Sequence, residues 1–377
     1  MIAAITIGCV ALLMLGIQPL ALGALQLGGR LNVMQMGTAA TVELLALGIV
    51  SAFMAARGRP RSLRAWTLVG CVLLIAANVF GLTANGSTFI VSRAIAGIGG
   101  GIIVWVATVL VIRRTDAARV NALFYAAQAL TQGAAAALIP LTLAAPFGAN
   151  ASLLVLGGCA VLVLPLILLL PQEVAAVQSE IYERSATQFS SVMGLCAAFL
   201  IMAGIVGVWV YLEPIAIASG MSESVISGSI AASLGAQVVG ALAIAAVIRL
   251  VSPFLGAALA ALAYVFLTIV FGWSHNVAVF VVATLTFGVL WSIGMSLLLP
   301  MMLRLDPTRR AALYLPAVIM FGCSSGPFIA GSFASDTDIA PALVACAVMF
   351  VASAGMTALA AFTSRKMSSL NPVSIDG

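Results

Sequence analysis

The sequence predicts an all-α membrane protein with about twelve transmembrane helices in two six-helix bundles. Hydrophobic residues make up 63% of the 377 residues and charged residues only 7%, whereas a soluble domain carries about a quarter charged residues. The apolar runs are about 20 residues long, enough for a helix to cross a hydrocarbon core of about 30 Å. Strand-like alternation of apolar and polar residues is absent from them, which argues against a β-barrel.

Hydropathy, read against glycine, proline and charged residues, places the spans in order along the chain. The first set is expected at 4–26, 33–56, 65–83, 88–112, 120–142 and 151–171. The second set is expected at 191–218, 224–248, 252–273, 278–303, 311–333 and 341–363. The first stretch has neither the basic start nor the clean cleavage site of a signal peptide, so we expect it to be retained as a span.

The long polar interruption of this pattern lies in the middle of the chain, at residues 172–190. Glutamates and an arginine replace the apolar residues there. We therefore expect an N-terminal six-helix bundle over 1–171, a cytoplasmic linker over 172–190 and a C-terminal six-helix bundle over 191–377.

The basic residues predict how the chain sits in the membrane, because Lys and Arg near span ends stay on the cytoplasmic side. With the N-terminus inside, all of the 16 basic residues except Arg30 and Arg93 fall on the inner side. We therefore expect both termini in the cytoplasm and a multi-pass protein of the cell (inner) membrane. The net charge of +5 is then a topology signal, since short separate loops do not form a nucleic-acid-binding patch.

Catalytic and metal-binding patterns are missing from the sequence. The six cysteines lie inside apolar runs, where a thiol behaves as a small hydrophobe, and their spacing suits neither disulfides nor a metal. The single histidine, His275, is expected in an outer loop, and no aspartate lies well inside a span. We therefore expect no enzyme, no cofactor and no metal site.

Ionisable groups inside spans are the first candidates for a functional site, because they usually face a cavity or a charged partner. Glu43 lies ten residues into the second expected span, roughly 15 Å deep at about 1.5 Å per residue. A carboxyl group so placed favours its neutral form and can load and release a proton. We predict a proton-coupling role for Glu43; the alternative is a protonated side chain that makes one interhelical hydrogen bond.

Glu213 is the second candidate for proton coupling. It directly precedes Pro214 near the outer end of the seventh expected span, where a proline bends the helix end, as in transporter helices that gate or bind. The alternative is an interfacial carboxylate beside the aromatic residues Trp209 and Tyr211.

Arg93 opens the fourth expected span and shares a helix face with Gly97, Gly101 and Trp105. Its fixed positive charge suits an anionic group or one of the two glutamates. The glycines on that face let another helix or a ligand approach the backbone. The structural alternative is helix packing by the glycines, with Arg93 reaching outward.

Two polar stripes keep helical phase inside apolar spans. The first runs along the fifth span and the second along the eighth. Their members are Asn121, Tyr125, Gln128 and Gln132, and then Ser229, Ser233 and Gln237. Such faces are penalised in lipid, so we expect them to point at a water-filled path or at the opposite half; the alternative is interhelical hydrogen bonding without a cavity.

Three local motifs resemble those of the major facilitator superfamily, and the resemblance covers essentially the whole chain. The loop 51–61 is similar to a family signature, although Ala55 stands at its aspartate position. Residues 93–101 are similar to the family signature that runs from arginine to glycine and is often linked to proton transfer. Residues 322–331 resemble the Gly-Pro signature that drug/proton antiporters carry in span five, yet here it stands in span eleven.

The resemblance implies that spans 1, 4, 7 and 10 line a central cavity and that spans 5 and 8 meet across the domain interface. The cavity would then hold Gln18, Arg93, Trp105, Trp209, Glu213 and Trp291 around the substrate. Together with Tyr125, Gln128, Gln132 and Gln237 of the polar stripes, these are the expected substrate-binding residues.

The expected function is secondary active transport of a small organic solute, anionic or amphiphilic, by alternating access and with proton coupling. A proton is favoured over sodium because the spans carry protonatable carboxylates and no oxygen-rich broken helix. Two alternatives stay open, drug or metabolite efflux by proton antiport and a receptor that no longer transports. We expect a monomer in the lipid bilayer.

Overall fold

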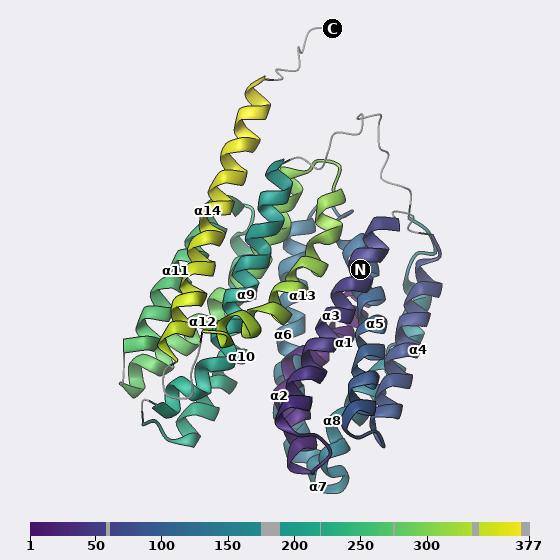
Figure 1. Cartoon of the computed structure of the whole chain (residues 1–377). Coiled ribbons are helices and arrows are strands. Elements are labelled where there is room, and N and C mark those ends of the chain that lie inside the picture. The colour runs from purple at the N-terminus through teal and green to yellow at the C-terminus, as the bar shows by residue number, and fades with distance from the viewer. Residues whose placement is uncertain (58–60, 175–188, 219, 274–275, 334–338, 371–377) are drawn as a thin grey trace.

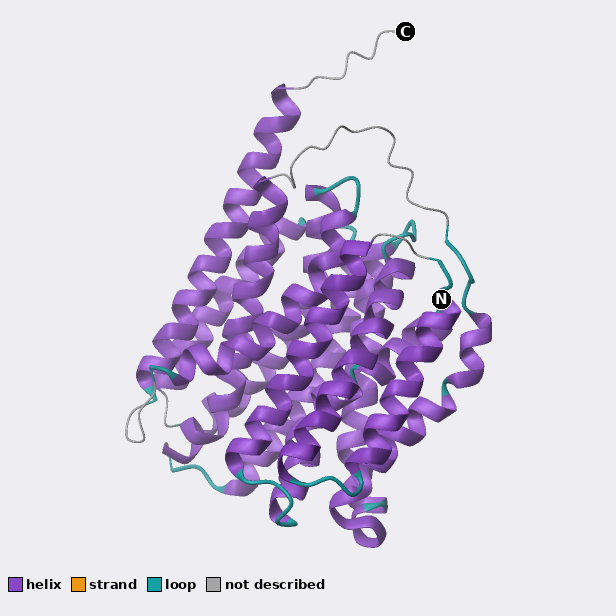
Figure 2. Ribbon diagram, turned by 45° about the vertical axis from the view of Figure 1, so that its right-hand side comes forward, coloured by secondary structure: helices purple, strands orange, loops and turns teal. Residues whose placement is uncertain are grey.

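The computed structural model describes the chain except for residues 58–60, 175–188, 219, 274–275, 334–338 and 371–377, and a few side chains inside helices, Glu213 among them, are also left out. Every regular element in the described part is helical (Figure 2). Most of the predicted linker therefore lies outside the described residues, as does the Gly58-Arg59 core of the loop motif.

The N-terminal half of the chain forms the elements α1 to η2. They are α1 (Ile2–Ala11), α2 (Leu13–Leu27), α3 (Val33–Arg57), α4 (Leu63–Gly81), α5 (Gly86–Val111), α6 (Ala117–Thr142), α7 (Ala144–Phe147), η1 (Gly148–Asn150), α8 (Ala151–Leu162) and η2 (Leu164–Leu169). The C-terminal half follows. It comprises α9 (Phe189–Ala218), α10 (Glu223–Val247), α11 (Pro253–Trp273), α12 (Val277–Leu305), α13 (Arg310–Gly331) and α14 (Ala340–Leu370).

These helices confirm the predicted class. Among the described residues 11 helices are long and apolar enough to cross a membrane, and up to 12 if a bent pair at the start counts as one span. The chain is thus a multi-pass membrane protein. Their ends lie within a few residues of the predicted ends for most spans, because glycine, proline and charged residues mark the places where a helix leaves the apolar layer.

The first span differs from the prediction of one continuous helix. The helix is interrupted at Leu12, between α1 and α2, and it bends by 51° further along, between Ile2–Gln18 and Leu20–Gln26. Gln132 of α6 donates a hydrogen bond to the Leu12 carbonyl at 2.8 Å. This bond partly replaces the backbone hydrogen bonds that the interruption removes. The sixth span also changes character, because its last part is the 3₁₀ helix η2 with Pro165 in its first turn.

The two halves of the chain lie side by side and meet along a small set of helices (Figure 1). Within the N-terminal half α5 packs between α3 and α4, and within the C-terminal half α9 packs between α13 and α14. Between the halves α13 packs on α3, and α10 packs on α6. The predicted meeting of spans five and eight is confirmed by the α6–α10 contact.

Glycines allow the close packing that positions the candidate site. A Cβ added at Gly97 would lie 2.3 Å from the Glu43 carbonyl oxygen, and one at Gly101 would lie 2.6 Å from that of Leu47. In the C-terminal half a Cβ at Gly326 would lie 2.1 Å from the Ala203 carbonyl oxygen. Helix packing by the glycines of residues 93–101 is therefore confirmed, and Gly326 of the Gly-Pro motif packs in the same way.

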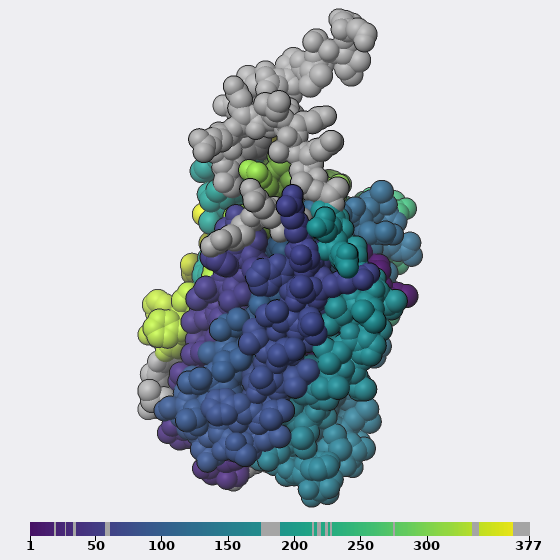
Figure 3. Space-filling model, turned by 90° about the vertical axis from the view of Figure 1, so that its right-hand side faces the viewer, coloured from purple at the N-terminus to yellow at the C-terminus, as the bar shows by residue number. Residues whose placement is uncertain are grey.

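The outer surface of the molecule is apolar where the helices face outward. Figure 3 shows the side covered by the N-terminal half. Side chains of α4 such as Leu68, Val72 and Val79 are exposed by about half of their surface, at 48%, 52% and 58%. Surfaces of this kind suit contact with lipid tails.

Candidate functional site

A buried ion pair lies inside the N-terminal half. Nη1 of Arg93 on α5 lies 3.9 Å from Oε1 of Glu43 on α3, and both side chains are almost completely buried. Nη2 of Arg93 donates to Oδ1 of Asn78 on α4 at 3.0 Å, and its guanidinium carbon lies 5.3 Å from the centre of the Phe89 ring. Three neighbouring helices thus hold the arginine beside Glu43, the partner that the sequence analysis considered for it.

One oxygen of the Glu43 carboxyl group makes no hydrogen bond to a described residue. Oε2 is buried and has no hydrogen-bond partner among the described residues. A small cavity of about 10 Å³ lies against Glu43, Asn78 and Arg93 and is closed by Met14 of α2 and Leu156 of α8, among others. This volume is about that needed for one water molecule. The site therefore has room for a proton donor or acceptor next to the carboxyl group.

Arg30, the other basic residue that the sequence analysis expected on the outer side, makes several hydrogen bonds within the N-terminal half. Its guanidinium donates to Oδ1 of Asn85 at 3.0 Å and to Oδ1 of Asn150 at 2.6 Å. It also donates to the carbonyl oxygens of Gly81 and Ala84, each at 2.5 Å. Arg30 thus joins the loops at one end of the N-terminal half, and burial lowers the pKa of its guanidinium.

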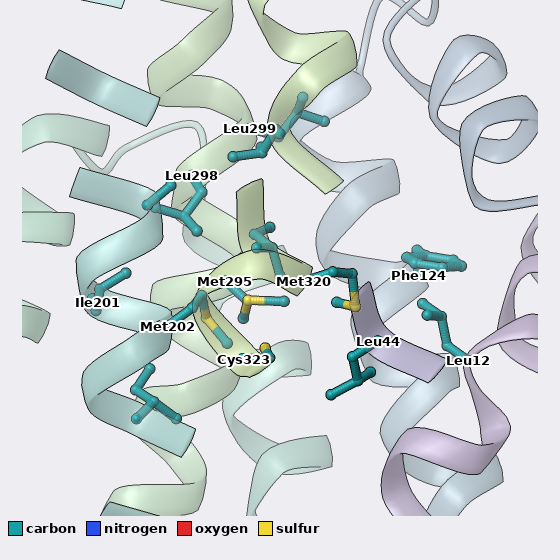
Figure 4. Close-up of a cluster of buried hydrophobic side chains, with 14 of the residues drawn as sticks. Leu12, Leu44, Phe124, Ile201, Met202, Met295, Leu298, Leu299, Met320 and Cys323 are labelled. Carbon is teal, nitrogen blue, oxygen red and sulfur yellow. The ribbon is translucent and has the colours of Figure 1, made fainter. Parts of the chain in front are cut away.

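A larger cavity lies between the two halves, with a volume of about 60 Å³. Its walls come from α2, α5 and α6 of the N-terminal half, from α12 and α13 of the C-terminal half, and from Leu12 at the interruption of the first span. Figure 4 shows Met295 and Met320 on the side of the C-terminal half, facing Leu12 and Phe124. This volume has room for about four to six water molecules.

Few of the described side chains in the wall of this central cavity are polar, and none of them is charged. The polar ones are Thr108 on α5 and Asn121, Tyr125 and Gln128 on α6. Nδ2 of Asn121 and Oε1 of Gln128 are buried without a hydrogen-bond partner among the described residues. The stripe predicted on span five therefore faces the space between the halves with three of its four members.

The other predicted substrate-binding residues with a polar side chain lie outside the wall of the central cavity. Gln132, the last member of the stripe on α6, is engaged with the Leu12 carbonyl. Gln237 is buried on α10, and Ser233 of the same stripe touches Gly288 of α12. Gln18 is half-buried on α2, with Nε2 unpaired among the described residues.

The predicted tryptophans also do not belong to the wall of the central cavity. Trp105 is buried in a separate apolar cluster with Met54 and Leu63. Trp209 and Trp291 pack edge to face, with ring centres 5.7 Å apart, and both contact Phe287 inside the C-terminal half. Their positions along the helices suit residues that line a cavity, but these large side chains pack between helices instead. The sequence alone does not distinguish a tryptophan that lines a cavity from one that packs between helices.

Arg93 is absent from the wall of the central cavity, because Glu43 and Asn78 take up its guanidinium. The side chain of Glu213 lies outside the described residues, so its predicted role stays a prediction. Among the described residues no group of His, Cys, Asp and Glu side chains is arranged to hold a metal ion.

Polar contacts join the two halves at the end of the molecule where α5 ends and α6 begins. Arg249, after α10, pairs with Asp116, directly before α6. Arg309 donates to the carbonyl oxygen of Ile112, which follows α5. Burial and the neighbouring Arg309 charge lower the pKa of Arg113. We call this end the linker end, because residues 172 and 189 also lie there.

Sequence comparisons alone find no relatives. No protein-family model matches the chain, and the search of curated proteins gives no match. Solved structures do match. The transporter FucP in its outward conformation aligns with a TM-score of 0.76 and 15% identity, over 95% of this chain and 97% of that one. The chain has the major facilitator fold.

Further solved structures agree with this assignment. A variant of the fucose:proton symporter FucP of Escherichia coli aligns with a TM-score of 0.74 and 14% identity, over 95% of this chain and 97% of that one. The human organic anion transporter MFSD10 aligns with a TM-score of 0.69 and 15% identity, over 96% and 97%. These proteins are transporters rather than enzymes, and the predicted resemblance to the major facilitator superfamily is confirmed at the level of the fold.

Sequence reasoning missed several wall residues of the central cavity. Leu12, Met295, Pro316 and Met320 are apolar residues in apolar spans, so nothing in the sequence separates them from residues that face lipid. Asn78 is a polar residue inside a span, and the sequence did not identify Arg93 as its partner. The sequence did contain a signal for this pair. An asparagine and an arginine lie in neighbouring spans, and a buried charge needs hydrogen-bonding partners.

Proposed function

We propose that this protein is a secondary active transporter that moves a small organic solute by alternating access. The observation that carries the proposal is the central cavity, which lies between the halves and takes its wall from both. A site so placed opens to one side or the other when one half rocks against its neighbour. The major facilitator fold and the transporters FucP and MFSD10 support this function.

The arrangement of the chain in the membrane follows from the same proposal. Residues 1–171 and 191–377 are the two six-helix bundles, and 172–190 is the linker between them. The linker end carries the basic loops, so it lies on the cytoplasmic side together with both termini, and the protein works as a monomer in the inner membrane. The contacts at the linker end then make this conformation one that is closed toward the cytoplasm.

Proton coupling is the second part of the proposal, with Glu43 as the proton-carrying residue and Arg93 as the charge that controls it. The ion pair at 3.9 Å favours the ionised carboxylate, whereas burial without a cation favours the neutral acid. A motion that separates α3 from α5 at this point therefore changes the proton affinity of Glu43. The symporter FucP supplies a precedent for proton use on this fold.

The small cavity beside Glu43 supports this role, because Glu43 lines a space of about one water molecule and its Oε2 has no hydrogen-bond partner among the described residues. A water molecule in that space would donate to the carboxylate or accept from the acid. Glu43 lies inside the N-terminal half, so the proton and the solute use different sites, on either side of the interrupted first span. Val10 and Ala11 line the small cavity, whereas Leu12 and Leu15 line the central one.

Accumulation in proteoliposomes tests the transport proposal. Purified protein is reconstituted, and a panel that contains fucose, an aromatic carboxylate and a neutral aromatic amide is offered under an imposed pH gradient. We expect at least one solute to accumulate above its outside concentration, and a protonophore to abolish the accumulation. Binding of these solutes without movement under either gradient direction would instead identify a receptor and overturn the proposal.

A further inference from the structure

The central cavity has a chemical character that restricts what it can hold. Its wall is built from apolar side chains, and the polar exceptions are uncharged. Thr108 already donates its hydroxyl to the Val104 carbonyl of its own helix at 2.8 Å. The hydrogen-bonding capacity that faces a ligand therefore comes from α6, from the amides of Asn121 and Gln128 and the phenol of Tyr125.

Two of these groups lack partners that buried groups ordinarily have. Among the described residues, Nδ2 of Asn121 is a donor without an acceptor, and Oε1 of Gln128 is an acceptor without a donor. Buried polar groups in native proteins are nearly always hydrogen-bonded. Both residues line the cavity while these two atoms are buried, so a ligand that draws the two amides round toward the cavity would supply the missing partners.

We propose that the solute bound here is electrically neutral, with an apolar body, a hydrogen-bond acceptor for Asn121 near one end and a donor for Gln128 near the other. The proposal rests on the transport function proposed above and names its substrate class. A full charge in this wall would be buried without a counter-ion, which is strongly unfavourable. The expected anionic solute would need Arg93, and that cation is held by Glu43 and Asn78.

The spacing of the two amides sets the shape of the solute. Asn121 and Gln128 are seven residues apart on one helix, which is about 10 Å along its axis. Room for about four to six waters corresponds to a body of roughly 120–180 Å³, similar to a cavity that accepts benzene. The solute is thus elongated and about the size of one aromatic ring with a polar substituent at each end.

Methionines in the cavity wall determine how selective the site is for the shape of the apolar part of the solute. Met295 and Met320 form part of the wall on the side of the C-terminal half (Figure 4). Their unbranched side chains adapt to different shapes. We therefore expect tolerance for the shape of the body and discrimination by charge and by the two hydrogen-bonding ends, because a missing hydrogen bond leaves a buried amide unpaired again.

The test compares small fragments that differ in charge and are matched in size and hydrophobicity. Neutral aromatic amides and alcohols, the corresponding carboxylates and the corresponding ammonium compounds are added to the purified full-length protein, and the apparent melting temperature is recorded. A fragment that binds the folded state raises it. We expect the stabilising fragments to be neutral ones that carry both a donor and an acceptor.

Variants connect binding to the two amides. Asn121→Leu and Gln128→Leu each remove one unpaired group, so both proteins should fold with unchanged or raised melting temperatures while binding the neutral fragments roughly tenfold more weakly. Thr131→Val on the same helix is the control, since Thr131 bonds to the Ala127 carbonyl and does not line the cavity; it should bind as the unaltered protein does.

Three results overturn the proposal. They are stabilisation chiefly by charged fragments, no stabilisation by any neutral fragment, and equal binding of neutral fragments by the two leucine variants and the unaltered protein. The outcome is separable from that of the transport proposal, because binding is measured without a membrane. Neutral binding without accumulation in proteoliposomes would refute transport and leave the character of the cavity established.

Discussion

Arg93 illustrates what the sequence can and cannot tell at the scale of single residues. A basic residue on the outer half of a span is exceptional, and that exception singled it out. The sequence also offered Glu43 as one of its possible partners, and the ion pair confirms that choice. The position of Asn78 could not be predicted, because it depends on how α4 rotates against α5.

Asn78 should matter for stability through its bond to Arg93. Replacing Asn78 with alanine leaves one buried N–H group of the guanidinium without an acceptor, at a cost of about 1.5–3 kcal/mol. We expect a clearly lowered apparent melting temperature of the purified protein. The matched control is Thr67→Val on the same helix, because the Thr67 hydroxyl bonds to the Leu63 carbonyl of its own helix. Similar melting of the two variants would contradict a special role for Asn78.

At the scale of helices, the glycines of α5 determine how close α3 and α4 approach. Gly97 and Gly101 face α3, and Gly99 faces α4, where an added Cβ would lie 2.6 Å from the Gly70 carbonyl oxygen. The sequence indicated this packing, since glycines at helical spacing in a span predict close contacts. The 51° bend of the first span lies between Gln18 and Leu20, so Pro19 was an available signal for it. The break at Leu12 has no such signal, because neither proline nor glycine stands at that residue.

Gly97→Ala tests the contact that holds Glu43 near Arg93. The new methyl group would lie 2.3 Å from the Glu43 carbonyl oxygen, so α3 and α5 must separate, at a cost of about 1–3 kcal/mol for overpacking. Both thermal stability and gradient-driven transport should fall. Gly158→Ala in α8 is the control, since a Cβ there meets nothing within 4 Å, and that variant should be at least as stable as the unaltered protein.

At the scale of the whole molecule, composition and span spacing were sufficient to predict the membrane class and the helix order. Each predicted span has a helical counterpart, apart from the interruption of the first and the 3₁₀ end of the sixth. The sequence predicted part of the wall of the central cavity, because the polar side chains on α6 recur at helical spacing. The apolar residues of the wall could not be predicted, since a methionine that faces a cavity and one that faces lipid look alike in a sequence.

Labelling of added cysteines tests the orientation in the membrane. A cysteine in place of exposed Arg61 or Arg310 at the linker end should be shielded from a membrane-impermeant thiol reagent in intact cells. One in place of exposed Thr83, at the opposite end, should react. The native cysteines are free but buried or half-buried, which keeps the background low. Reaction of Arg61→Cys from outside would reverse the proposed orientation.

The contact between Asp116 and Arg249 tests the rocking motion. An exposed ion pair of this kind contributes little stability, about 0–1 kcal/mol, so neutralising Asp116 should have only a small effect. Joining the two positions covalently should instead hold the linker end closed. We expect Asp116→Cys with Arg249→Cys, bridged by a short bifunctional thiol reagent, to stop transport and to recover it when the bridge is cleaved. Undiminished transport by the bridged protein would contradict alternating access.

The most direct measurement of the central claim compares accumulation with exchange in the Glu43→Gln variant. Glutamine keeps the size of the side chain but carries no proton, whereas exchange of solute across the membrane needs no net proton movement. We predict that Glu43→Gln fails to accumulate solute under a pH gradient, yet still exchanges labelled for unlabelled solute. Full gradient-driven accumulation by Glu43→Gln, by Glu213→Gln and by the double variant would contradict proton coupling through these carboxylates.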